Sequence, residues 1–247
     1  MSAGCATTEV IFALRHPAFL LGLLPGFLIG VIARSAVQQA LARSGPALGR
    51  GPRRGRLRPV GGRRSGGFPR PRAGWAAYLD PYGAVAALLS GAGWGARAQS
   101  RRSGRGSDVM MLVAALVVHA VLVAVGLAGY RAAGGDISLV HFIPVSQVLH
   151  GSFDLGNVGA SAGLGFAMVN LACGLLALVP IPPLELGVIL WSRLPRSPGA
   201  RRLAYRVLEE QWGVAVILLL LLLPLAGQQP VLLSLIDNVS DPILRAL

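Results

Sequence analysis

Residues 170–190 read NLACGLLALVPIPPLELGVIL, an apolar stretch interrupted near its middle by three prolines. Pro180, Pro182 and Pro183 remove backbone donors and clash with the preceding turn, so a regular helix must break at this point. Glu185 follows two residues after the last proline. An acidic side chain and broken backbone inside a membrane are costly and mark a functional site by default. The stretch therefore predicts a Pro-broken membrane helix over 160–190; the alternative is a kinked helix with Glu185 at the headgroup level.

The composition predicts an all-α polytopic membrane protein. Of the 247 residues, 53% are hydrophobic and only 13% are charged, whereas a soluble domain carries about 25% charged residues. Several apolar runs approach the roughly 20 residues that cross a bilayer. We expect one integral membrane domain over 1–247, with about four transmembrane helices and one re-entrant or short helical segment. The expected helices are 17–41, 109–130, 160–190 (broken) and 207–225, and the shorter segment is 75–95.

The net charge of +13 comes from arginine alone, because the chain contains no lysine. The arginines gather in a polybasic loop at 43–72 and in two further loops at 97–107 and 193–206. No stacking aromatic residues or RNA-binding motif accompany them, so we expect no nucleic-acid partner. The positive-inside rule places all three loops in the cytoplasm of a multi-pass cell-membrane protein, with anionic lipid as their partner. That topology requires 75–95 to enter the membrane and return on the same side.

The proline-rich stretch resembles a motif of the site-2 protease family, the intramembrane zinc metalloproteases. The family consensus is Asn-x-x-Pro-x-Pro-x-Leu-Asp-Gly, and Pro180, Pro182 and Leu184 match it. Residues 79–81 (LDP) and 93–95 (GWG) resemble the family's LDPxG and FGWA landmarks. The resemblance implies a helical bundle in which the first core helix packs against the proline-broken segment around one site.

The residues that would perform the chemistry differ from the family pattern. Ala177 stands where the motif has Asn, and Glu185 stands where it has the zinc-binding Asp. On the first core helix the family carries His-Glu-x-x-His, with two zinc-binding histidines and a glutamate base. Aligned on this segment, Ser35 and Gln39 replace the histidines and Ala36 replaces the glutamate.

These replacements predict a protein that is not an enzyme and binds no zinc cofactor. A catalytic zinc needs three good ligands and a base for its water, and a serine hydroxyl and an amide are poor ligands beside imidazole. We therefore expect a pseudoenzyme that binds a membrane partner, such as a single-span protein, in the former substrate groove. Two alternatives are a small transporter or channel subunit built around the broken helix, and an active intramembrane metalloprotease with an unrecognised site.

Two polar side chains inside the apolar spans lead to structural expectations. Glu185 must be neutralised, because an isolated carboxylate away from water is costly, and we expect it to form a polar clasp with Arg34, Ser35 or Gln39. The alternative is that Glu185 points into the headgroup region and pairs with nothing. His119 lies near the middle of the 109–130 helix, and we expect a buried, hydrogen-bonded side chain rather than a metal ligand.

Overall fold

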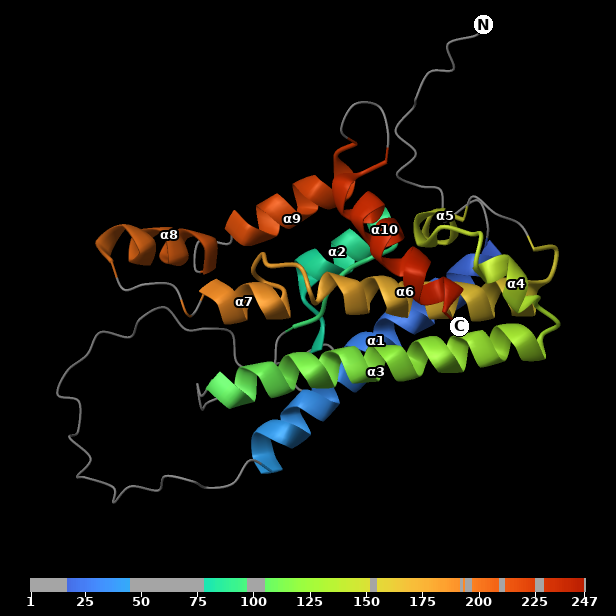
Figure 1. Cartoon of the computed structure of the whole chain (residues 1–247), viewed down its shortest axis with the longest axis horizontal. Coiled ribbons are helices and arrows are strands. Elements are labelled where there is room, and N and C mark those ends of the chain that lie inside the picture. Colours follow the sequence, from blue (N-terminus) through green and yellow to red (C-terminus); the bar gives the residue numbers. More distant parts are fainter. Residues whose placement is uncertain are drawn as a thin grey trace, which may run out of the picture.

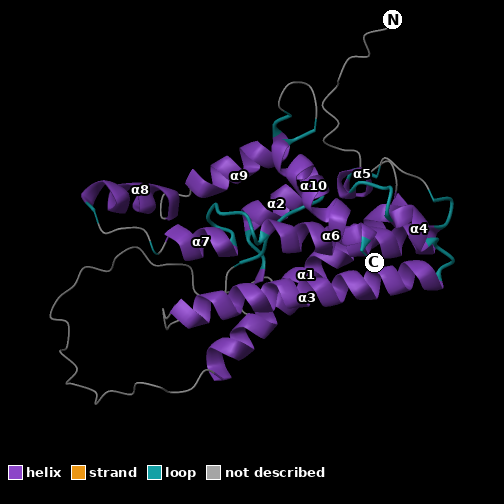
Figure 2. Cartoon of the chain, in the orientation of Figure 1, coloured by secondary structure: helices purple, strands orange, loops and turns teal. Residues whose placement is uncertain are grey.

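The structure is a computed structural model that describes residues 17–44, 78–96, 105–151, 155–191, 193, 197–208, 212–224 and 229–246. In these ranges the chain forms helices joined by loops, and its only β-type pairing consists of isolated bridges (Figure 1, Figure 2). The helices are α1 Pro17–Ser44, α2 Pro81–Ser90, α3 Arg105–Ala132, α4 Ile137–Val140, α5 Val145–Leu149, α6 Val158–Leu176, α7 Glu185–Trp191, α8 Pro198–Leu208, α9 Trp212–Leu222 and α10 Val231–Arg245.

Three helices, α1, α3 and α6, are long and apolar enough to cross a membrane. Their apolar parts contain 25, 25 and 19 residues. At about 1.5 Å per residue, even the shortest approaches the roughly 30 Å of a bilayer's hydrocarbon core. The expectation of an all-α membrane protein is confirmed, and the predicted helices at 17–41 and 109–130 correspond closely to α1 and α3.

Helix α6 is the centre of the bundle and packs against both α1 and α3 (Figure 1). Glycine makes these close approaches possible. A Cβ on Gly22 of α1 would lie 1.9 Å from the carbonyl oxygen of Ala162, and one on Gly126 of α3 would lie 2.7 Å from the backbone nitrogen of Ala167. Small residues let helix backbones approach closely, which is the usual way that helices associate in membranes.

The short helix α2 begins where its local sequence specifies. Asp80 is the N-cap residue, and its carboxylate accepts hydrogen bonds of 2.9 Å from the backbone N–H groups of Tyr82 and Gly83. Pro81 takes the first helical position, where its missing N–H costs nothing. The helix ends at Gly91, whose φ of 74° favours glycine. The LDP motif thus has a direct structural role as a helix start.

After α2 the chain returns to the point at which the segment began. Leu79 pairs with Gly95 in an antiparallel bridge, and Ala96 donates its backbone N–H to the Tyr78 carbonyl at 2.8 Å. The helix has 10 residues, which is about 15 Å and half the thickness of a bilayer core. The described ends of this segment, Tyr78–Leu79 and Gly95–Ala96, therefore lie side by side.

The predicted broken helix over 160–190 is present as two helices. α6 ends at Leu176 and α7 begins at Glu185, with a cis peptide bond between Pro182 and Pro183. A hydrogen bond from the Leu186 N–H to the Ala177 carbonyl, 3.0 Å long, joins the two sides of the break. The prolines thus stop one helix and Glu185 starts the next.

The predicted helix over 207–225 falls partly on α9 and partly on residues 209–211 and 225, which lie outside the described residues. Helix α9 has 11 residues, about 16 Å, which is roughly half of a bilayer core. Pro224 follows its end and cannot continue a helix. Among the described residues three helices reach spanning length. The basic loop expected at 193–206 also contains a helix, α8, with Arg202 and Arg206 on its exposed surface.

The C-terminal region forms α10. Leu232, Leu233 and Ile236 are buried in the hydrophobic core, and Asp237 accepts a 2.9 Å hydrogen bond from the backbone N–H of Ser146. The apolar residues recur at helical spacing, so one face of the helix is packed and the other is exposed. Most of the predicted polybasic loop at 43–72 lies outside the described residues, as do residues 97–104.

Candidate functional site

The break between α6 and α7 places Glu185 inside the protein. Glu185 is the first residue of α7 and is 5% exposed. Two residues later, Gly187 allows α7 to pack against the break, because a Cβ there would lie 2.2 Å from the backbone carbon of Ile181. An acidic side chain in the first turn is favoured by the helix dipole. The sequence LELG therefore orients a carboxylate into the bundle.

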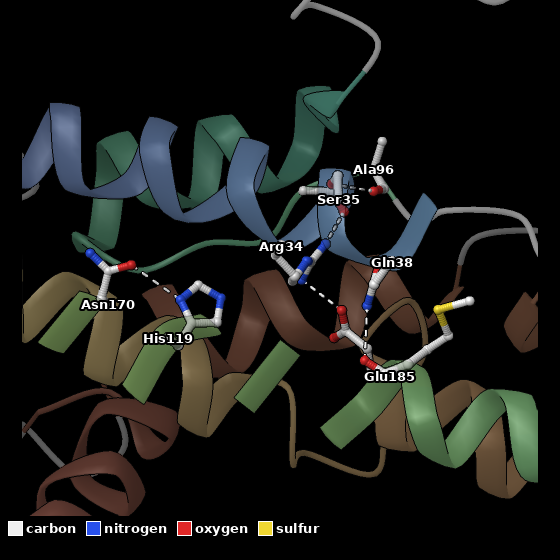
Figure 3. A network of polar contacts seen from close by, with 9 residues as sticks. Arg34, Ser35, Gln38, Ala96, His119, Asn170 and Glu185 are labelled. Carbon is white, nitrogen blue, oxygen red and sulfur yellow. Dashed lines mark hydrogen bonds and ion pairs between the residues drawn. The ribbon is translucent and has the colours of Figure 1, made fainter. Parts of the chain in front are cut away.

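Arg34 of α1 is the partner of this carboxylate (Figure 3). Its Nη1 lies 2.7 Å from Glu185 Oε1, and the two side chains are 4% and 6% exposed. The contact is a buried ion pair. Arg34 Nη2 also donates to the Gly95 carbonyl at 3.2 Å. The guanidinium thus joins α1, α7 and the loop that follows α2.

Gln38 extends the same polar cluster to α3. It lies one helical turn after Arg34, is 1% exposed, and donates through Nε2 to the Met111 carbonyl at 3.1 Å. Ser35 is also buried, but its hydroxyl is directed to the Ala96 carbonyl at 3.5 Å. Figure 3 shows Arg34, Gln38 and Glu185 facing one another between the helices.

Of the clasp candidates, Arg34 contacts Glu185, whereas Gln38 rather than Gln39 lies at the inward position beside it. Arg34 pairs with Glu185, as expected, so the first core helix and the broken segment do meet. Gln39 and Ala36, two of the positions aligned with the family's active site, are half-buried and exposed respectively. Gln38 takes the inward position instead, because residues four apart share one helix face and Gln38 follows Arg34 at that spacing.

The remaining aligned position, Ala177, is buried at the break, and its backbone carbonyl accepts a hydrogen bond from the Leu186 N–H. Unlike the Asn of the family motif, it has no side-chain amide. Pro180, Pro182 and Pro183 lie between α6 and α7 and form the break itself. Of the positions aligned with the family's active site, Ser35 directs its hydroxyl to the Ala96 carbonyl and Ala177 offers only its backbone carbonyl at the break.

A second buried polar group lies along the same face of α1. His119 of α3 and Asn170 of α6 are 3% and 1% exposed, and their Nδ1 and Oδ1 atoms lie 3.1 Å apart. Asn170 Nδ2 donates to the carbonyls of Gly26 and Phe166 at 3.2 and 2.9 Å. Oδ1 is then the acceptor, and His119 donates to it from Nδ1. The expectation of a buried, hydrogen-bonded His119 is met.

Sequence reasoning missed Gln38 and Asn170, although a spacing signal for Gln38 was present. Gly26, Gly30, Arg34 and Gln38 recur every four residues and form one face of α1. A Cβ on Gly30 would lie 2.5 Å from Asn170 Oδ1 and 3.1 Å from the His119 ring. The small residues of this face leave room for the His119–Asn170 pair, and its polar residues form the clasp.

The side chains around Glu185 do not fit a zinc ion. The guanidinium of Arg34 lies 2.7 Å from the carboxylate, and a fixed positive charge at that position opposes a divalent cation. Ser35 is directed to a backbone carbonyl, and neither a serine hydroxyl nor a glutamine amide is a ligand that zinc prefers. In the part of the chain that the structure describes, no three metal-binding side chains lie together.

Comparisons with protein-family models, with curated proteins and with solved structures returned no match for this chain.

Proposed function

We propose that this chain is a non-catalytic, multi-pass protein of the cell membrane that binds a membrane partner and is held closed by the Arg34–Glu185 clasp. The observation that carries the proposal is a buried ion pair at the helix break, where the resemblance to site-2 proteases would require a metal ligand. An ion pair in this position joins the helices that zinc would otherwise bridge.

The side chains at and near Glu185 support the absence of catalysis. Hydrolysis by a zinc protease requires a metal-bound water and a base to accept its proton. Glu185, the one carboxylate of this cluster, is paired with Arg34, and Ala36 has no group that could accept a proton. The cluster is therefore suited to fixing helices relative to one another, not to activating water.

A groove beside the clasp supports partner binding. It lies between α1 and α3, has a volume of about 530 Å³, and is lined by apolar side chains that include Ala33, Val37 and Val117. Ala33 and Val37 directly precede Arg34 and Gln38 on α1, so the groove and the clasp lie on neighbouring faces of one helix. A single apolar helix of a one-span membrane protein is the occupant that this shape and chemistry favour.

The arginine distribution supports a topology in which the loops at 43–72, 97–107 and 193–206 face the cytoplasm. The contact between Leu79 and Gly95 supports it as well, because a segment whose ends meet can enter and leave a membrane on one side. Arginine side chains near the cytoplasmic leaflet would then bind anionic lipid, at about 1 kcal/mol for each residue near the surface.

Site-specific photocrosslinking tests the proposal directly. A photoreactive residue at Val117, in the groove, should crosslink to a one-span membrane protein in intact cells. The matched control is Leu219 of α9, which is 55% exposed and outside the groove, and should give only lipid adducts. Equal protein crosslinking at both positions would show that the groove is not a specific binding site.

Metal analysis of the purified protein tests the loss of catalysis independently. We expect substoichiometric zinc and no cleavage of model transmembrane substrates. Stoichiometric zinc together with cleavage would overturn the non-catalytic assignment.

One observation favours a second candidate, a transporter subunit. The buried polar groups at Asn170, His119, Arg34 and Gln38 follow one face of α1 into the helix break, and transporters place broken helices and polar groups near the bilayer midplane. Flux of ions and small polar solutes into proteoliposomes distinguishes this candidate, because a partner-binding protein should give no flux above that of empty vesicles.

A further inference from the structure

Helix α8 separates its charged side chains from its apolar ones. Arg202 and Arg206 lie four residues apart, and Leu203, Ala204 and Val207 recur at helical spacing. At about 100° per residue, the two sets occupy separate faces of the helix. The 11 residues of α8 include no acidic side chain, so each charge on the helix is positive. Its arginine face is therefore complementary to an anionic partner.

The apolar face of α8 has no place in the hydrophobic core. Among the described residues, the core contains none from α8; Ala204 and Val207 are half-buried, and Leu203 is 52% exposed. Figure 1 shows this helix beyond the end of α7, outside the bundle. Helix α10 is also amphipathic, but it buries Leu232 and Leu233 in the core. Because a surface helix is stabilised by burying its apolar face, α8 needs an apolar environment that the bundle does not supply.

The helices on either side of α8 place it near a membrane surface. Trp191 ends α7, and Trp212, which is 58% exposed, begins α9. Tryptophan is enriched where a membrane meets water, because its ring is apolar and its N–H group is polar. Helix α8 lies between these two residues in the chain and is about 16 Å long. It can therefore lie along the headgroup layer, on the face that the proposed topology assigns to the cytoplasm.

We propose that α8 binds the membrane surface as an amphipathic helix whose ligand is anionic phospholipid. In this mode Leu203, Ala204 and Val207 enter the boundary between headgroups and acyl chains, while Arg202 and Arg206 bind lipid phosphate. The inference rests on the proposed topology and goes further than it, because an arginine-rich loop binds lipid through charge alone, whereas α8 also inserts apolar side chains.

Salt separates this mode of binding from attraction by charge alone. The Debye length falls from about 10 Å at 0.1 M salt to about 3 Å at 1 M, so an arginine-rich loop that binds only through charge is released. Apolar side chains that are already inserted among the acyl chains are not screened. Once bound, α8 should therefore stay at the membrane in about 1 M salt.

Spin labels in the full chain measure the depth of each face of α8. A single cysteine carries the label, with Cys5 and Cys173 replaced by alanine, in nanodiscs that contain phosphatidylglycerol or only phosphatidylcholine. Oxygen concentrates in lipid and a nickel chelate in water, so the ratio of their collision rates with the label reports depth. In anionic discs, a label at Leu203 should give a ratio several-fold higher than one at Tyr205, which lies beside the arginine face and is 59% exposed. In phosphatidylcholine discs the two ratios should converge.

Two double variants test the role of the arginines through the Leu203 label. Arg202→Gln/Arg206→Gln should lower the oxygen preference of this label to the value seen in phosphatidylcholine. Arg131→Gln/Arg245→Gln removes as many charges from the last turns of α3 and α10 and should leave the preference unchanged. Equal effects of the two double variants would overturn the proposal, as would equal ratios at Leu203 and Tyr205 in anionic discs, or release of the Leu203 label into water at about 1 M salt.

Failure of this proposal and failure of the proposed topology are distinguishable. Nanodiscs expose both faces of the bilayer to the reagents, so a wrong cytoplasmic assignment leaves the depth ratios unchanged. It would appear instead as labelling of the 193–206 segment by an impermeant reagent in intact cells. A Leu203 label in water at every lipid composition would overturn the membrane-binding role of α8 and leave the topology intact.

Discussion

Replacing Glu185 by glutamine removes the negative charge of the clasp while keeping the size of the side chain. Arg34 then remains 4% exposed with its charge uncompensated, although its hydrogen bond to the Gly95 carbonyl persists. Breaking a buried ion pair by removing one partner typically costs about 3–5 kcal/mol. We expect Glu185→Gln to lower the free energy of unfolding by an amount in this range.

The ion pair at the C-terminal end of the chain is a matched control. Asp241 and Arg245 approach to 2.8 Å, but their side chains are 47% and 67% exposed and lie four residues apart on α10. Exposed pairs at this spacing contribute about 0.3–0.5 kcal/mol. Asp241→Asn removes the same charge from an equally short contact, and should leave the stability almost unchanged.

Equilibrium unfolding in mixed detergent micelles gives the free energies, with thermal unfolding of the same samples as a second measurement. The double variant Arg34→Met/Glu185→Met completes the cycle. It should recover much of the loss seen in Glu185→Gln, because an apolar replacement of a buried ion pair leaves no unpaired charge. If Glu185→Gln is no more destabilising than Asp241→Asn, or if the double variant is no better than the single one, the clasp does not stabilise the bundle.

Three further predictions follow from other parts of the structure. Asp80→Ala removes the N-cap of α2 and should lower the free energy of unfolding by about 1 kcal/mol, as measured by thermal unfolding. Asp80→Ser keeps a capping oxygen and should retain most of the stability. Equal losses in the two variants would exclude a capping role. Gly22→Ala places a Cβ 1.9 Å from the Ala162 carbonyl oxygen and should lower the free energy of unfolding by about 1–3 kcal/mol. The control Gly129→Ala on α3 meets no atom within 4 Å and should be neutral or stabilising. Similar effects of the two changes would contradict the close α1–α6 crossing. Single cysteines placed in the 43–72, 97–107 and 193–206 segments should resist membrane-impermeant reagents in intact cells, and labelling of any one from outside would contradict the cytoplasmic assignment.

Local sequence was sufficient for the elements whose formation depends on nearby residues. Pro180, Pro182 and Pro183 end α6 because proline lacks the donor and the space that a helix interior requires, and Asp80-Pro81 starts α2 through an N-cap and a fixed φ. The long apolar runs predicted α1 and α3 because the membrane requires spans of that length. Helix α9 has 11 residues before Pro224, and residues 209–211 ahead of it lie outside the described ranges, so the fourth span expected over 207–225 stays a prediction.

The sequence by itself determined the membrane class, the position of the helix break, and the need for a partner for Glu185. Only the tertiary structure decided which partner that is, and which glutamine joins it. Arg34 and Glu185 are 151 residues apart in the chain, by subtraction of their residue numbers, so no local pattern relates them. Gln38 rather than Gln39 faces the cluster because the rotation of α1 is fixed by the close packing of Gly22 and Gly30 against α6. A step of one residue turns a helical side chain by about 100°, and that rotation is set by packing between helices rather than by the order of residues within one helix.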